Sequence, residues 1–167
     1  MHNDRRIYVR AFILALLSPL SACQADSNPT DGTFPMNQSK GNNQREYVTF
    51  NAVTFNYTKT AVFDVFLSGK NAGGAGPLSG GGGIMAGVQI PLGEQTLTWI
   101  LGGPEGMARN GETVTCKNKI TIEKTSIPSE TRYVGVHIYP DDTAELTFAN
   151  GLPTATNRGR KLWEEGH

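Results

Sequence analysis

Short apolar runs, rich in β-branched and aromatic residues, alternate with turn residues through the middle of the chain. None of these runs keeps a helical period over three turns. Clusters of Gly, Pro, Asn and Asp separate several of them. The runs cover residues 47–55, 60–67, 84–90, 96–101, 113–122, 133–139 and 144–148. Their length and spacing are typical of strands, so we expect residues 46–153 to form one β domain.

We predict an all-β fold, a small antiparallel β-sandwich or open barrel of about seven strands. Antiparallel pairing is expected because no helix that would connect parallel strands is visible between the runs. Pro140, Asp141 and Asp142 stand between the last two runs and form the clearest hairpin turn.

Residues 69–83 interrupt the strand pattern with a glycine-rich segment. It is not a P-loop, because no Gly-Lys-Ser or Gly-Lys-Thr closes it. It is not a dinucleotide-binding turn either, because a strand-like run follows it in place of a helix. Two interpretations stay open: a flexible loop between strands, or a segment whose missing side chains let the backbone approach a protein partner closely. The candidate contact residues are Gly73, Gly74, Gly76, Ser79, Gly80, Gly81, Gly82 and Gly83.

The N-terminus has the layout of a secretory signal, with basic residues, then an apolar run, then small residues before a cleavage site. The basic residues are Arg5, Arg6 and Arg10, and the apolar run covers residues 11–17. That run is much shorter than the roughly 20 residues of a spanning helix. Leu20-Ser21-Ala22 directly before Cys23 resembles the bacterial lipobox. We therefore expect residues 1–22 to be removed as a lipoprotein signal peptide; the alternative is an ordinary signal peptide with a chance cysteine.

In lipobox precursors the cysteine thiol receives a diacylglycerol, and the new amine is usually acylated. Cys23 is therefore the predicted lipidation site, through which the protein would be anchored to a lipid bilayer. One acyl chain binds a membrane only marginally, whereas two or more anchor a protein stably. The expected location is the cell envelope, with the domain facing the periplasm.

Two polar segments flank the predicted β domain. Residues 23–45 are expected to be the lipidated N-terminus and a flexible linker, because they hold few large apolar residues. Residues 154–167 form a C-terminal tail, for which a short helix and a frayed segment both fit the sequence. Trp163 is expected to dock on the β domain, with docking on a partner as the alternative.

The charge of the chain excludes one class of partner. Basic and acidic residues are equal in number, 15 of each. Removing residues 1–22 takes away three arginines and one aspartate, which leaves a net charge of about −2. This charge is too weak to attract nucleic acid or an anionic bilayer by itself, so we expect no nucleic-acid partner.

No residue pattern indicates catalysis, so we predict a protein that is not an enzyme and needs no cofactor or metal. Ser79 lies in the glycine-rich segment without a Gly-x-Ser-x-Gly motif, and His137 lies inside a strand-like run. Asp141 and Asp142 are explained by their turn, and no set of His and Cys has metal-ligand spacing. With Cys23 lipidated, Cys116 is expected to be a buried small hydrophobic residue, with an intermolecular disulfide or a reactive thiol as alternatives.

Several segments together resemble a family of short proteobacterial lipoproteins with a glycine-rich β domain of unknown function. The resemblance covers about residues 48–153. It rests on Phe55-Asn56-Tyr57-Thr58, Gly80-Gly81-Gly82-Gly83, Val88-Gln89-Ile90-Pro91 before Trp99, and residues 133–140. Many relatives have a cysteine pair after the glycine run. This chain has Ile84-Met85-Ala86 there, so no role of that pair is carried over.

The resemblance implies a function, because genes for such lipoproteins are often found beside phospholipase effectors of the type VI secretion system. It implies an immunity protein that binds a secreted phospholipase in the periplasm and occludes it before it reaches the bilayer. Gln24 after the lipidated cysteine favours the outer membrane over the inner one. The alternative function is a structural or assembly lipoprotein that binds another component of the cell envelope.

Overall fold

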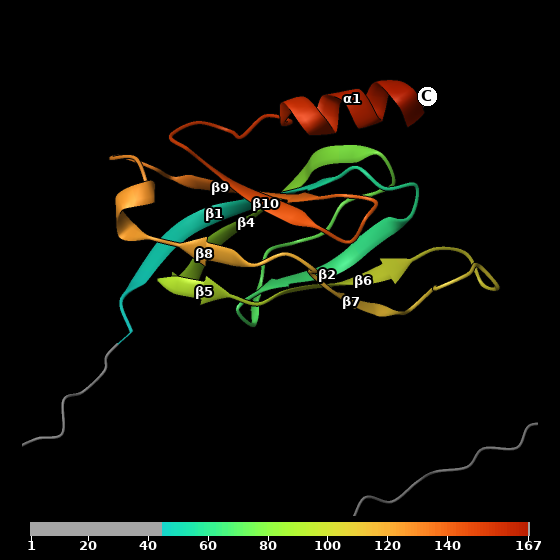
Figure 1. The fold of residues 1–167 in the computed structure, drawn as a ribbon, viewed down its shortest axis with the longest axis horizontal. Coiled ribbons are helices and arrows are strands. Elements are labelled where there is room, and N and C mark those ends of the chain that lie inside the picture. Colours follow the sequence, from blue (N-terminus) through green and yellow to red (C-terminus); the bar gives the residue numbers. More distant parts are fainter. Residues whose placement is uncertain (1–44, 167) are drawn as a thin grey trace, which may run out of the picture. The chain divides into compact units, whose positions relative to one another are not determined.

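The computed structural model describes residues 45–166, which form two four-stranded sheets and one two-stranded sheet (Figure 1). The strand order is β10-β9-β1-β4 in sheet A, β3-β2-β6-β7 in sheet B and β5-β8 in sheet C. The strands are β1 (Tyr47–Asn56), β2 (Ala61–Leu67), β3 (Lys70–Asn71), β4 (Ser79–Pro91), β5 (Gly93–Gln95), β6 (Leu97–Gly102), β7 (Thr113–Thr115), β8 (Ile120–Ile122), β9 (Tyr133–Ile138) and β10 (Ala144–Ala149). A 3-10 helix, η1 (Lys124–Ser126), and the helix α1 (Asn157–Gly166) complete the fold. The predicted all-β fold is confirmed.

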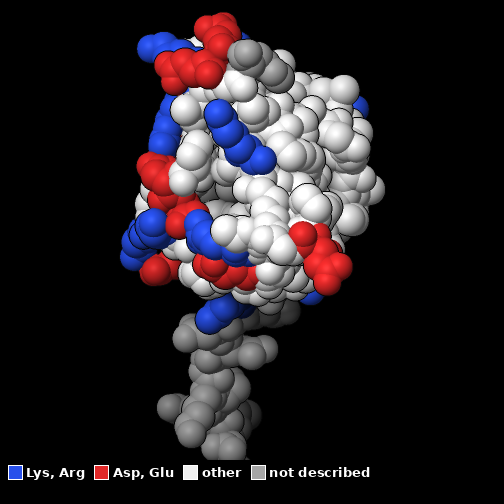
Figure 2. All heavy atoms as spheres, turned by 90° about the vertical axis from the view of Figure 1, so that its right-hand side faces the viewer, with Lys and Arg blue, Asp and Glu red and all other residues white. Residues whose placement is uncertain are grey.

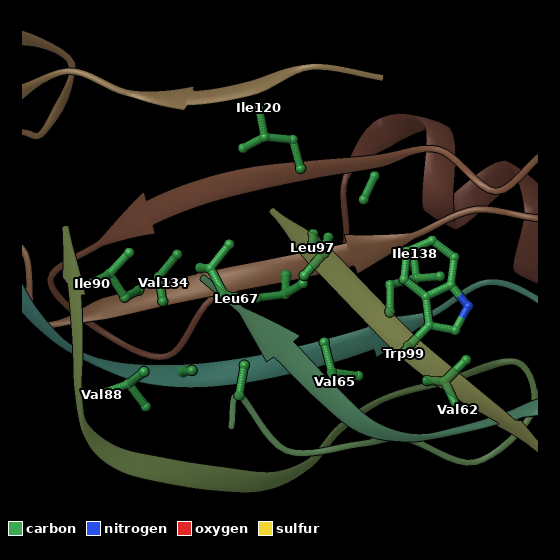
Figure 3. Packing of buried hydrophobic residues seen from close by; sticks show 14 of the residues in the cluster. Val62, Val65, Leu67, Val88, Ile90, Leu97, Trp99, Ile120, Val134 and Ile138 are labelled. Atoms are coloured by element: carbon green, nitrogen blue, oxygen red, sulfur yellow. The ribbon is translucent and has the colours of Figure 1, made fainter. Parts of the chain in front are cut away.

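The main core forms where apolar side chains of the sheets meet. Leu97, Trp99 and Leu101 of β6 recur at every second residue and are all buried, as expected for one face of a strand. Figure 3 shows side chains of sheet B packed among those of sheet A, which include Val134 and Ile138 of β9. This packed core fixes the positions of the strands, including those at the edges of the sheets.

The other face of sheet A carries a second, aromatic cluster, which explains why β1 lacks a clean alternation. Phe50 and Ala52 of β1 belong to the main core, whereas Val53, Phe55 and Tyr57 join the second cluster. A strand covered on both faces is apolar on both, so its sequence shows a nearly continuous apolar run.

The helix α1 covers this aromatic cluster, as Figure 1 shows along one side of the sheets. Thr156 caps the helix, since its Oγ1 accepts a hydrogen bond from Gly159 N at 2.9 Å. Trp163 Nε1 donates to Asn56 O at 3.3 Å, and its ring lies 4.9 Å from that of Tyr57. Of the two forms that the tail sequence allows, the helix is therefore observed, and the predicted docking of Trp163 on the β domain is confirmed.

One strand pair departs from the expected antiparallel arrangement. β1 pairs with β4 antiparallel on one edge and with β9 parallel on the other, with Asn51 opposite Tyr133. The connection from β1 to β9 runs through β2 to β8, which belong to all three sheets, so no crossover helix is required. The predicted hairpin at Pro140-Asp141-Asp142 is confirmed, because β9 and β10 pair antiparallel across it.

The single strand predicted over residues 113–122 is wrong. Its first part, β7, pairs with β6 in sheet B, and its last part, β8, pairs with β5 in sheet C. Between them the side chain of Asn118 holds Ala144 of β10 through two hydrogen bonds, of 3.0 Å to its carbonyl oxygen and 2.8 Å from its nitrogen. A polar side chain that satisfies a neighbouring backbone in this way ends the strand locally.

The predicted signal peptide, the lipidation site Cys23 and nearly all of the predicted linker lie outside the described residues. Among residues 45–166, no helix has the length and apolar character that crossing a membrane requires.

Candidate functional site

The glycine-rich segment is partly built into the sheets: it contains β3 and the beginning of β4, and the connection between them is hydrogen-bonded to β2. Its first half runs along β2: Ala72 N donates to Val65 O at 2.7 Å, and Val62 and Ala75 exchange two backbone hydrogen bonds of 2.9 Å. Its last residues, 79–83, begin β4, and the first two of them, Ser79 and Gly80, pair with β1. The segment therefore passes from the edge of sheet B to the edge of sheet A.

Asn56 fixes the point at which the segment crosses between the sheets. This asparagine is fully buried, and its Nδ2 donates to Thr60 O and Gly76 O, each at 2.8 Å. Its Oδ1 accepts a hydrogen bond from Thr58 N at 2.9 Å. Ser79 Oγ donates to Gly76 O at 2.9 Å. The side chains of Asn56 and Ser79 therefore both hold the carbonyl of Gly76 at the crossing.

Five glycines of the segment are required by the fold itself. A Cβ at Gly74 would lie 2.7 Å from Val62 O, and one at Gly80 would lie 2.2 Å from Cδ1 of Phe55. Gly69, Gly73 and Gly81 have φ angles of +75°, +94° and +72°, a conformation that residues with a side chain rarely adopt.

Gly82 and Gly83 have no such reason within the described residues. A Cβ at either position would meet no atom within 4 Å, and neither has a left-handed φ. Glycine in a strand lowers stability by roughly 0.5–1 kcal/mol relative to alanine. A strand glycine without an internal reason is typical of a place where another backbone or a ligand comes close.

These two glycines lie on an exposed edge, which we call the β4 edge and define as residues 80–87. β4 is the outermost strand of sheet A. The register jumps from Gly80 opposite Phe55 to Ile84 opposite Val53, so Gly81, Gly82 and Gly83 have no partner on β1. All residues from 80 to 87 are exposed, including the apolar side chains of Ile84 (53%) and Met85 (38%).

The β4 edge also lacks the charges with which proteins commonly protect sheet edges. No Asp, Glu, Lys or Arg occurs between Lys70 and Glu94. Natural edge strands carry lysine, proline or bulges that prevent pairing with another chain. The β4 edge carries bulges, at 81–83 and near Gly87, but no charge along its length.

A shallow hollow of about 270 Å³ lies beside this edge, between β3 and the middle of β4. Lys70 and Asn71 line one side, and residues 85–89 line the other.

The residues considered for catalysis are each engaged elsewhere. His137 is fully buried, with Tyr57 Oη 2.9 Å from its Nδ1 and Thr147 Oγ1 2.8 Å from its Nε2. Burial lowers the pKa of His137 to about 4. No hydrogen bond joins Ser79 to His137 among the described residues.

Asp141 acts within its turn, where its carboxylate accepts from Thr143 and Arg158 and its pKa is lowered by these hydrogen bonds, the one from Thr143 first. Within the part of the chain that the structure describes, no group of three or more His, Cys, Asp or Glu residues is placed to hold a metal ion.

Cys116 follows directly after β7 and is half-buried. Its Sγ donates to Asn118 Oδ1 at 3.2 Å, and burial raises the pKa of the thiol. A raised pKa keeps the thiol protonated and lowers its reactivity. The side chain packs at the margin of the main core, close to the predicted role of a small hydrophobic residue.

The candidate contact region expected from the sequence is the glycine-rich segment, and the structure adds neighbouring residues to it. Ile84, Met85 and the hollow beside them follow the glycines and complete the exposed edge. The signal that could have identified them is the uncharged stretch from 71 to 93, which is longer than the glycine run itself.

Comparisons of the chain with protein-family models, with curated proteins and with solved structures found no match.

Proposed function

We propose that the protein is a membrane-anchored periplasmic lipoprotein whose β domain binds and neutralises a phospholipase delivered by type VI secretion. In this proposal, acylated Cys23 holds the protein at the outer membrane. The β domain occludes the lipase at the surface that the lipase attacks. A tether supports such a role, because it raises the effective concentration of the domain where the toxin must arrive.

The single observation that carries the binding role is the pair Gly82 and Gly83 on the β4 edge. Nothing in the described domain needs glycine at these positions, and both lower the stability of the free protein. We infer that a partner needs them, because a side chain there would keep its backbone away from β4.

The proposed mode of binding is strand addition. An extended segment of the lipase would lie along residues 80–87, with main-chain hydrogen bonds supplying affinity. An uncharged edge suits an uncharged segment, since a buried unpaired charge would oppose the contact. Ile84 and Met85 would add apolar contact area next to the glycines.

The double substitution Gly82→Val and Gly83→Val tests the proposal, because stability and binding should change in opposite directions. Valine favours strands, so we expect the free energy of unfolding to rise by about 0.5–1 kcal/mol per site or stay unchanged. Binding to the phospholipase encoded by the adjacent gene should weaken by about tenfold or more. The measurements are urea unfolding, and survival of cells that co-express the lipase in the periplasm.

The matched control is Gly151→Ala, since Gly151 also has open space around its Cβ position but lies away from the β4 edge. It should protect cells as well as the parent does. If the parent gives no protection against the lipase, the immunity role is lost. If the valine variant protects fully, the assignment of the β4 edge is lost.

The variant Cys23→Ser tests the anchor separately. We expect it to lose labelling by palmitate and retention in the membrane fraction, because the thiol that accepts lipid is absent. The β domain should keep its fold, since the substitution lies outside it. Labelling of the variant at the parental level would contradict lipidation at Cys23.

The alternative, a structural or assembly lipoprotein, shares the anchor and the exposed edge and differs in its partner. Pull-down from detergent-solubilised membranes separates the two functions. A stable envelope protein that depends on Gly82 and Gly83, with no binding to the lipase, would favour the alternative.

A further inference from the structure

A cavity of about 430 Å³ opens at one end of the domain, beneath the last turns of α1. Figure 2 looks onto this end, where the loop between β6 and β7 and the C-terminal end of α1 lie. Trp99 and Leu101 of β6 form the buried part of its wall, and Leu78 and Leu162 enclose it from the sides. Its volume falls within the range of roughly 300–1,000 Å³ that is typical of small-molecule sites.

The cavity continues along the helix. A second hollow of about 570 Å³ shares Pro140, Leu162 and Glu165 with the first and extends beside Arg158 and Lys161. The combined hollow is therefore elongated, which suits an extended chain better than a compact ring system.

The charges around the cavity divide into paired and unpaired groups. Arg109 is held by Glu112 at 2.8 Å, and Asp142 by Lys117 at 3.0 Å. Lys59 lines the cavity and forms no ion pair with any carboxylate among residues 45–166.

Glu165 is the remaining acidic group of the rim, and it lies one helical turn after Lys161. Charges four residues apart on a helix are neighbours and offset one another. No ion pair joins Lys161 and Glu165 among the described residues, so the unpaired charges of the rim are Lys59, Lys161 and Glu165, with one positive charge in excess.

We propose that this cavity binds an anionic amphiphile, a molecule with an acyl chain and a carboxylate or phosphate head. The chain would lie against Trp99 and Leu101 and continue along Leu162, and the head would lie beside Lys59. The site is separate from the β4 edge, so the inference does not depend on the proposed protein partner.

Trp99 makes the proposal directly testable, since bromine on a bound chain quenches a tryptophan that it contacts. The experiment uses the full chain with Cys23→Ser, so that no acyl group of its own competes. It also carries Trp163→Phe, which leaves Trp99 as the reporter. The probes are a bromine-terminated undecanoate, the matching undecyl phosphate and the matching neutral undecanol, each below its micelle concentration.

We expect saturable quenching by both anions and weaker binding of the alcohol. Lys59→Gln should raise the dissociation constant of both anions about fivefold to tenfold and leave that of the alcohol unchanged. Ala108→Phe should abolish quenching by all three probes, because residue 108 is an exposed position that lines the cavity. A preference for one anion identifies the head group as carboxylate or phosphate.

Non-saturable quenching, or saturable quenching that Ala108→Phe leaves intact, would overturn the site. Equal affinity for the alcohol, with no effect of Lys59→Gln, would overturn the anionic class. If Trp163→Phe lowers stability, the chain with both tryptophans serves as reporter and Trp99→Phe as the control that should not respond.

Discussion

Acidification from about pH 7.5 to about pH 4.5 is expected to lower the free energy of unfolding by about 2.5 kcal/mol through His137 alone. His137 has no exposed surface, and burial lowers its pKa to about 4, while Glu145, directly opposite on β10, acts in the other direction. In the unfolded chain a histidine has a pKa of about 6.5. As the pH falls, the unfolded state therefore binds a proton first and is favoured.

The loss of stability at low pH follows from the lowered pKa of His137. The stabilisation by His137 is fully present above about pH 6.5 and is lost as the pH falls toward about 4. The hydrogen bonds fit a neutral ring with its proton on Nε2. In that tautomer Nε2–H donates to Thr147 Oγ1, and the hydroxyl of Tyr57, whose Oη accepts from Thr156 N, donates to Nδ1. A proton on Nδ1 as well would require Tyr57 Oη to accept from the ring in addition to Thr156 N.

The measurement is urea unfolding of the parent and of His137→Gln at both pH values. The glutamine amide does not titrate, so the variant reports the loss that comes from all other groups, including Asp141. The parent should lose about 2.5 kcal/mol more than the variant between the two conditions. Parallel pH dependence of the two proteins would show that His137 is protonated in the folded state at little cost.

Gly159→Ala is expected to destabilise the domain by about 2 kcal/mol, although alanine is the better helix former. Alanine in a helix interior is favoured over glycine by roughly 1 kcal/mol. At this position, however, the added Cβ would lie 2.0 Å from Cζ of Tyr57, a rigid ring that is itself buried. Overpacking of this kind typically costs about 1–3 kcal/mol, and the ring cannot move without breaking its contact with His137.

The result to measure is a lower urea midpoint together with a red shift of the emission of Trp163, whose ring packs on Tyr57. The control is Lys161→Ala on the same helix, an exposed position where the change should stay within about 0.5 kcal/mol. A more stable Gly159→Ala protein would mean that helix propensity outweighs the contact between α1 and β1.

Half of the ten strands could be predicted closely from the sequence, because their apolar runs are short and bounded by turn residues. β1, β2, β6, β9 and β10 lie within about one residue of the predicted runs. The division of residues 113–122 between β7 and β8 could not be predicted. It depends on the hydrogen bonds between Asn118 and Ala144, which are close in space and distant in sequence.

The glycine-rich segment shows a different limit of sequence reasoning. Local propensity assigns glycines to loops, but Asn56 and the backbone of β2 hold this segment in place through long-range hydrogen bonds. The sequence alone also cannot separate Gly80, which the ring of Phe55 requires, from Gly82 and Gly83, which nothing nearby requires. That distinction defines the candidate site, and it can be made only from the three-dimensional structure.

The parallel pairing of β1 with β9 has a kinetic consequence. The first strand of the domain meets its parallel neighbour only after about two thirds of the described chain, since the hydrogen bond between Tyr57 and His137 spans 80 positions. The contact of Trp163 with Asn56 spans 107. Domains dominated by such distant contacts fold in milliseconds to seconds, because the entropy of closing long loops is lost before stabilising contacts can form. Before β9 has formed, one edge of β1 has no strand beside it and is open to pairing with a wrong segment. In a chain synthesised from the N-terminus, β1 therefore gains this neighbour only when the last third of the described residues has been made.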